Sequence, residues 1–449
     1  MGKLVSIAKQ LLPAPVFQYF KRRTLDNVFK KLRQEYPAYR ERMLRRAEEV
    51  RRKEVINVLF YIWQPSFWKV DSLFRLMLEH PRFNPIVCPV AAYDYTDPEE
   101  RQSVLEETRR YFKQKGYPVL EIEGVGPVAK SFVLTGRGVE KIREAFAPDI
   151  IFVQTPYETV QESVDADMEH ELYCYVPYGF RNSGATFSFD NATQNKYLFN
   201  FVENEYIAEL AKSKMSNGGA NVCLTGYPPV DMFAVNYADR TDESAWKVQD
   251  APCKKVIWAP HWALGTGSIM QNGVFSRYAD AMLELARSYA GRVQFAFKPH
   301  PKLMPELYMH PEWGVERTDA YYAAWELLPN AQLEQGEYAS LFRQSDGMIH
   351  DSGSFIVEYL MTGNPCCFFH VHEDYPSFNK MTHDALAAHY WEDSIAGVRR
   401  YIDSVILGTD DPLAAARKEF FDSYLMPPKG VSAAQNIVDA ILGKLSNPV

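Results

Sequence analysis

The chain has 449 residues, of which 47% are hydrophobic, 24% charged and 14% aromatic. This length suggests two or three domains of roughly 150 residues each, and the composition is that of a globular protein rather than a disordered or fibrous one. The net charge of −8 argues against a dedicated nucleic-acid-binding protein.

The first 53 residues form a basic segment. They hold fifteen Lys and Arg against five Asp and Glu, so the segment carries a charge of +10 and the rest of the chain −18. Apolar residues at helical spacing (Leu4, Ile7 and Leu11) predict a basic helical arm over residues 1–53. Such an arm can lie on an anionic membrane surface, where each basic residue contributes about 1 kcal/mol. The alternative is an arm that docks on its own protein or on a second subunit.

The sequence predicts a cytoplasmic protein. No apolar run approaches the ~18 residues that span a bilayer, and no small-residue cleavage site follows the N-terminal stretch. Six cysteines without a CxxC pair are too few for a disulfide framework, and adjacent Cys366 and Cys367 are expected to be buried free thiols. With the arm on a membrane, the protein would be peripheral on the inner membrane face.

Between the arm and about residue 240, short apolar runs alternate with helical stretches. The helical stretches are 70–79, 98–115 and 141–146, and the strand-like runs are 55–62, 84–89, 119–122, 148–154, 172–176, 198–203 and 222–225. Strands that alternate with helices predict a parallel α/β sheet.

The same pattern restarts after the polar segment 236–252. Helical stretches at 275–289 and 355–361 alternate with strands at 255–260, 293–298, 347–350 and 365–370. We therefore predict an α/β fold with a Rossmann-like domain over 54–240 and a second over 250–430. A last segment, 431–449, contains a helix that can cross back to the first unit. Ligands in such sheets bind beyond the carboxyl ends of the strands, so two facing units would hold them in a cleft.

The first candidate motif follows the strand 255–260. Residues 259–262 read APHW, with His261 at the strand end, and 265–268 read GTGS. Gly267 allows close approach of the backbone to a ligand, and Ser268 can cap the following helix, which is a natural anion site. An ordinary turn and helix cap would give the same pattern.

The second motif is KPHPK at residues 298–302. Two prolines, including Pro301, fix the backbone around His300, with Lys298 and Lys302 beside it. A rigidly held imidazole next to cations suits a phosphate whose negative charge grows as it leaves. The alternative is a capped turn with a surface histidine.

The third motif is HDSGS at residues 350–354, followed by a helix that carries Glu358. Ser352, Gly353 and Ser354 would cradle a diphosphate through backbone N–H groups and two hydroxyls. Glu358 lies one helical turn further on and can accept hydrogen bonds from ribose hydroxyls. A plain helix cap with a solvated Glu358 is the alternative.

In this order the segments resemble the CDP-glycerol glycerophosphotransferase family, the poly(glycerol phosphate) and poly(ribitol phosphate) enzymes of teichoic-acid synthesis. The family carries APTW at a strand end, then RxHP, then TDYSS with an acidic residue, then KP before an apolar strand. Here these positions read APHW, KPHP, HDSGS with Glu358, and NP at 364–365. The family's GYPRxD looks like GYPPVD at 226–231, and the resemblance covers roughly residues 150–400.

The resemblance implies a GT-B fold, in which two Rossmann-like domains face each other and the C-terminal one binds the donor. It implies that His300 contacts the donor phosphates, Ser352 and Ser354 the pyrophosphate, and Glu358 the ribose. One departure is clear: the family has a His-Gly-Thr segment, whereas residues 175–180 read YVPYGF and contain no histidine. The identity of the general base is therefore open: His261, which we rank first, or Glu158 could take this place, or Tyr178 as a hydrogen-bonding group.

The implied reaction transfers glycerol- or ribitol-phosphate from a CDP-activated donor to a hydroxyl of a polysaccharide or lipid-linked acceptor and releases CMP. One alternative is a CMP-sugar-dependent sialyl- or Kdo-transferase of capsule synthesis, and another is a non-catalytic GT-B protein that binds a nucleotide or polymer. We expect no dedicated metal site, because we interpret the DAD string at 165–167 as a solvated stretch and His370 with His372 as a strand end. No cofactor is firmly implied, although a divalent cation stays open.

Overall fold

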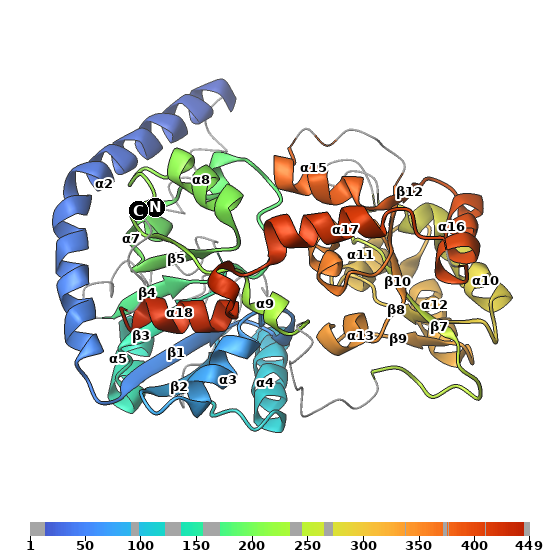
Figure 1. Ribbon diagram of the computed structural model, residues 1–449, viewed down its shortest axis with the longest axis horizontal. Coiled ribbons are helices and arrows are strands. Elements are labelled where there is room, and N and C mark those ends of the chain that lie inside the picture. The colour runs from blue at the N-terminus through green and yellow to red at the C-terminus, as the bar shows by residue number, and fades with distance from the viewer. Residues whose placement is uncertain are drawn as a thin grey trace.

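The computed structural model describes residues 14–90, 98–121, 136–155, 171–233, 245–264, 273–336, 338–370, 375, 377–408 and 410–443. Figure 1 shows two α/β units side by side, with a long N-terminal helix along the outer edge of the first unit. Within the described residues, each unit contains one six-stranded sheet, and every strand pair in both sheets is parallel. The predicted α/β class with two Rossmann-like sheets is confirmed.

The first sheet has the strand order β2-β1-β3-β4-β5-β6. Its strands are almost wholly buried because helices cover both faces. They are β1 (Ile56–Ile62), β2 (Phe83–Pro89), β3 (Ile150–Val153), β4 (Leu172–Tyr175), β5 (Phe199–Val202) and β6 (Val222–Leu224), and the helices are α3 (Asp71–Glu79), α4 (Pro98–Gln114), α5 (Gly136–Phe146), α7 (Ala192–Lys196), α8 (Glu205–Lys214) and α9 (Pro228–Asp231). The chain leaves β1 in one direction and returns on the other side as β3. The strand order therefore reverses between β1 and β3, and ligands bind at such switch points.

The second sheet has the order β12-β11-β10-β7-β8-β9, with its switch point between β7 and β10. The strands are β7 (Lys254–Ala259), β8 (Val293–Phe297), β9 (Ala331–Leu333), β10 (Gly347–His350), β11 (Cys366–Phe369) and β12 (Tyr390–Glu392). The helices are α10 (Phe275–Ser288), α11 (Leu303–Met309), α12 (Gly314–Leu327), α13 (Ala339–Arg343), α14 (Phe355–Glu358), α15 (Lys380–Ala387), α16 (Ile395–Tyr401) and α17 (Ala414–Phe420).

The structure differs from the sequence-based prediction at short elements. Strands β9 and β12 have three residues each and were not predicted, because a run of three carries no usable periodicity. The run predicted as a strand at 119–122 contributes a single bridge, from Val119 to Val87 beside β2.

Within the described residues the basic arm is one helix, as predicted, and the second half of that helix belongs to the first unit; the predicted positions Leu4, Ile7 and Leu11 lie outside the described residues. Helix α2 (Ala14–Arg51) buries Met43 and Val50. Arg40 donates hydrogen bonds from Nη1 to Leu198 O at 2.7 Å and from Nη2 to Ala220 O at 3.3 Å. The second half of α2 therefore docks on its own protein, which was the alternative to membrane binding. In the described part of the chain, no helix has the length and apolarity needed to cross a membrane.

The C-terminal helix α18 (Ala433–Ile441) packs on α3 and α9 of the first unit, as the red end of the ribbon in Figure 1 shows. Asp231 at the end of the GYPPVD segment caps this helix, accepting from Ala433 N at 2.8 Å and Ala434 N at 2.9 Å. Gly226 has φ +85°, and a Cβ there would lie 2.9 Å from Pro427 Cβ. This segment is thus the joint at which the C-terminal chain rejoins the first unit.

Replacing Asp231 by Ala should lower the free energy of unfolding by about 1–3 kcal/mol, because two buried N–H groups of α18 lose their acceptor. Asp231→Asn keeps one acceptor oxygen and should cost less, since burial raises the pKa of Asp231 and so penalises its charge. Urea unfolding measures the free energy of unfolding of both variants. An unchanged midpoint for Asp231→Ala would show that the cap contributes nothing to the joint.

Candidate functional site

Two imidazoles meet at the carboxyl edge of the second sheet. His261 follows β7 and His300 follows the neighbouring strand β8, and their ring centroids are 5.4 Å apart. The N–H of His300 donates to Pro260 O at 3.1 Å, which ties the two strand-end loops together. Both histidines are half-buried. The structure therefore brings together two residues that lie 39 positions apart in the sequence.

Backbone contacts set the tautomer of both rings. Ala263 N–H donates to Nδ1 of His261 at 3.2 Å, and Lys302 N–H donates to Nδ1 of His300 at 3.1 Å. A neutral imidazole that accepts at Nδ1 carries its proton on Nε2. Each ring thus offers an N–H donor, which suits a phosphate oxygen. A base role for His261 would require its proton to shift to Nδ1, where the Ala263 N–H already donates.

Burial keeps both rings neutral. It lowers the pKa of His261 to about 4 and that of His300 to about 3, and for His300 the nearby His261 and Lys302 act in the same direction. The site can therefore donate hydrogen bonds near neutral pH without carrying imidazolium charge.

Asp351 holds the His261 loop in place. Its buried carboxylate follows β10 and accepts from His261 N at 2.6 Å and from Val274 N at 2.8 Å. Burial raises the pKa of Asp351 to about 6, against the opposing effect of these backbone hydrogen bonds. Asp351 was not among the predicted site residues, although it follows β10 at the switch point between β7 and β10. The other two predicted residues of this loop, Gly267 and Ser268, lie outside the described residues.

The Ser352–Ser354 loop lies against the first unit. Ser352 is buried, Ser354 is exposed, and the Ser354 side chain makes no capping hydrogen bond to α14. Gly353 O accepts from Asn182 Nδ2 of the first unit at 2.6 Å. The predicted diphosphate loop is therefore on the face that meets the other unit.

Glu358 is buried at the junction of the two units. Its Oε2 accepts from Tyr338 OH at 2.5 Å and lies 3.6 Å from Lys69 Nζ of the first unit. Lys69 Nζ also hydrogen-bonds Tyr338 OH and lies 4.2 Å from that ring's centroid. A ribose that hydrogen-bonds Glu358 would share this carboxylate with Tyr338 and Lys69. Lys69 and Tyr338 could not be found from the sequence, because neither stands in a recognisable motif.

The cations of the KPHPK motif border the histidine pair. Lys298 is buried, donates from Nζ to Gly336 O at 2.7 Å and lies 5.9 Å from the Tyr338 ring centroid. Pro301 and Lys302 are exposed, and Lys302 Nζ lies 5.9 Å from the Trp262 ring centroid.

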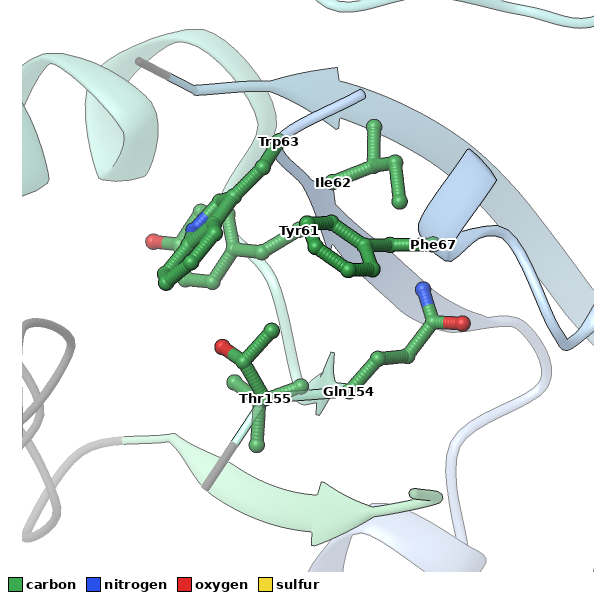
Figure 2. A pocket seen from close by; sticks show the side chains of 7 residues that line it. Tyr61, Ile62, Trp63, Phe67, Gln154 and Thr155 are labelled. Carbon is green, nitrogen blue, oxygen red and sulfur yellow. The ribbon is translucent and has the colours of Figure 1, made fainter. Parts of the chain in front are cut away.

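A small hollow lies at the switch point of the first sheet, at the carboxyl ends of β1 and β3. Figure 2 shows the side chains around it, and its lining residues are Tyr61, Ile62, Trp63, Phe67, Val153, Gln154 and Thr155. Gln154 Oε1 accepts from Lys69 N at 2.8 Å, while Gln154 Nε2 is buried without a hydrogen-bond partner in the described part of the chain. The hollow thus offers an apolar wall and one amide donor.

Tyr178 and Gly179, where the family carries its His-Gly-Thr segment, connect this hollow to Glu358. The Tyr178 ring packs edge-on against Phe67 at 4.8 Å between centroids, and Tyr178 N–H donates to Gln154 O at 2.9 Å. A Cβ at Gly179 would lie 3.7 Å from Glu358 Oε1. Glu158, the base candidate of the first unit, lies outside the described residues.

Two α/β units, each with a six-stranded parallel sheet, form a GT-B fold, as predicted, and the solved structures of similar fold include enzymes. No family model matches the sequence, and no curated protein matches it. A variant of the wall teichoic acid polymerase TagF has a TM-score of 0.57 at 15% identity over 96% of this chain and 98% of its own. A UDP-GlcNAc 2-epimerase from Neisseria meningitidis bound to UDP-GlcNAc has a TM-score of 0.53 at 16% identity, covering 87% and 100%. At these identities the likeness establishes the shared fold, in agreement with the resemblance that the motifs indicate.

Proposed function

We propose that the protein transfers a polyol phosphate, glycerol- or ribitol-phosphate, from a CDP-activated donor to a hydroxyl of a cell-surface polysaccharide or lipid-linked acceptor, releasing CMP. The observation that carries this proposal is the pair of neutral imidazoles, His261 and His300, beyond the carboxyl ends of β7 and β8 and next to the switch point of the second sheet. A TagF variant of the same fold (TM-score 0.53, 14% identity, 94% and 96% coverage) was soaked with CDPG, which supports a CDP-linked donor.

In the proposed reaction the acceptor oxygen attacks the phosphorus that carries the polyol. A new P–O bond forms, the bond between that phosphorus and the CMP oxygen breaks, and the acceptor proton passes to the base. Such transfers depend on positioning and on stabilising the charge of the leaving group. His300, through Nε2–H, and Lys298 would stabilise departing CMP. The loop 352–354 and residues Gly267 and Ser268 would hold the pyrophosphate, and Glu358 the ribose.

The hollow at Gln154 is our proposed place for the acceptor hydroxyl. Its unpartnered amide donor and aromatic wall suit an alcohol oxygen on an apolar or sugar face. Glu158 follows Thr155 by three residues and would be the base from this side. His261 is the base candidate from the donor side, although its proton would first have to move from Nε2 to Nδ1.

A donor screen tests this function. The full chain is incubated with CDP-glycerol, CDP-ribitol, CMP-sialic acid or UDP-GlcNAc together with acceptor oligomers, and release of CMP or UDP is followed. Turnover with a CDP-polyol supports the proposal. Turnover with CMP-sialic acid alone would replace it with the glycosyltransferase alternative. Nucleotide binding without any turnover would favour the non-catalytic alternative.

We further propose that the protein is peripheral at the cytoplasmic membrane face through its arm. Since the second half of α2 docks on the first unit, we assign this role to residues 1–33, which hold eight basic residues and one acidic residue. Each basic residue near an anionic surface contributes about 1 kcal/mol.

Deleting residues 1–33 should therefore weaken binding to anionic vesicles at least ~100-fold at low salt. Co-sedimentation with phosphatidylglycerol-containing vesicles measures this, and neutral vesicles are the control. Replacing Lys21, Arg22 and Arg23 by Gln in the full chain separates charge from helix length, and should weaken binding in part. Equal binding of all three proteins would refute the membrane role of the arm.

A further inference from the structure

Three side chains of the types that bind metals converge beneath the Ser352–Ser354 loop, outside the proposed reaction centre. His350 ends β10, Cys366 begins the adjacent strand β11, and His389 lies between α15 and β12. One ligand atom from each lies within 4.8 Å of the others. All three side chains are buried, with exposures of 0%, 0% and 3%.

In both histidines the hydrogen bond made by Nδ1 leaves Nε2 unprotonated. His350 Nδ1 lies 3.0 Å from Ser352 O, and His389 Nδ1 lies 2.8 Å from Ala385 O. A carbonyl oxygen only accepts, so each Nδ1 carries the proton and each Nε2 has a lone pair. Both Nε2 atoms are buried and have no hydrogen-bond partner among the described residues. Two buried acceptors without a donor are unfavourable unless something else satisfies them.

We propose that His350, Cys366 and His389 bind one thiophilic metal ion, Zn²⁺ in the first place. Metal-ligating histidines commonly donate their other ring N–H to a backbone carbonyl, which is the arrangement at both residues here. Thiolate and imidazole together are a ligand set of Zn²⁺, with bonds of about 2.0–2.3 Å. Such bonds require the three donor atoms to draw together by about 1 Å.

The charges around the trio allow a bound cation. Burial raises the pKa of the Cys366 thiol well above its usual value, and Arg417 acts in the opposite direction. Metal binding would therefore displace the thiol proton to solvent, as at other thiolate sites. The charge of Arg417 is matched by Asp411, with which it forms an ion pair.

The proposed site would fix the base of the donor loop. It joins β10, β11 and the segment before β12, and His350 contacts Ser352 within that loop. Since all three ligands are enclosed, the role we assign to the ion is structural. The inference is independent of which donor the protein uses.

Metal analysis of the full-length protein tests the site. Protein purified without chelators should contain about one zinc per chain by mass spectrometry. After chelation, Co²⁺ should produce a thiolate-to-cobalt charge-transfer band. Cys366→Ser should abolish the band and lower the zinc content at least tenfold. The matched control is Cys367→Ser, because Cys367 is the adjacent, equally buried residue and faces the opposite side of β11.

Other outcomes are equally decisive. Should Cys366→Ser fail to fold, His389→Gln provides the second variant, with the same expected loss of metal. Copper in place of zinc, with the same dependence on Cys366, also supports a thiophilic site. Absence of bound metal together with absence of the cobalt band would overturn the proposal. Metal that persists in both Cys366→Ser and His389→Gln would also overturn it, since that metal would be bound elsewhere.

Discussion

Replacement of His300 by Ala should lower the turnover number at least ~100-fold while leaving the unfolding midpoint nearly unchanged. His300 is held by its N–H bond to Pro260 O and by the Lys302 N–H on its Nδ1, so its Nε2–H has a fixed direction. Losing one preorganised donor to a developing phosphate charge, or one general acid, typically costs this much. CMP release under saturating donor measures it.

His310→Ala is the matched control for this experiment. His310 makes the same local contact, accepting from Glu312 N at 3.2 Å on Nδ1, but stands after α11 rather than at a strand end. It should retain normal turnover. Near-normal activity of His300→Ala would remove His300 from the mechanism.

The acid limb of the pH profile gives a second check. Because the folded protein holds the pKa of His261 and His300 well below the usual range, both stay neutral as the pH falls from 8 to 6. Protonation of these rings should reduce kcat/KM only near pH 4 and below. A loss of activity centred near pH 6.5 that disappears in His300→Ala would contradict the neutral-donor role.

The strands that carry the site were predictable because their physics is local. β1, β7 and β8 are largely buried and read as apolar runs, and β7 and β8 are followed by Pro260 and Lys298. Parallel strands place their carboxyl ends at one edge, which is why His261 and His300, each predicted at a strand end, lie at the same edge of the second sheet. The orientation of each ring was not predictable, because it depends on backbone N–H groups two residues away.

The junction around Glu358 was not predictable for a different reason. Lys69 and Glu358 are 289 positions apart, and nothing near either residue marks it as half of a pair. Their contact depends on how the two units face each other, which no periodicity encodes. The same holds for His350 and His389, which were brought together by packing across three elements. The ribose contact of Glu358 was assigned from its position after the HDSGS loop and from the family resemblance, and that assignment stays a prediction.

Replacement of Lys69 by Met should destabilise the protein by about 3–5 kcal/mol, because it leaves the Glu358 carboxylate buried without its cation. The side chains of Lys69 and Glu358 are only 7% and 3% exposed, so solvent screens the pair little. Urea unfolding provides the measurement. For comparison, Lys254→Met removes a cation from Asp346 in an exposed pair, with exposures of 50% and 32%. That variant should differ from the parent by no more than about 1 kcal/mol.

The double variant Lys69→Met/Glu358→Gln decides whether charge is the cause. It removes the unpaired carboxylate while Gln can still accept from Tyr338 OH, so it should be more stable than Lys69→Met alone, although it carries one more substitution. This follows because the cost of breaking a buried pair is mainly that of the orphaned charge rather than that of the lost attraction. A double variant less stable than Lys69→Met would show that the orphaned carboxylate is not the main cost, and that its hydrogen bond from Tyr338 OH contributes more than its burial penalises.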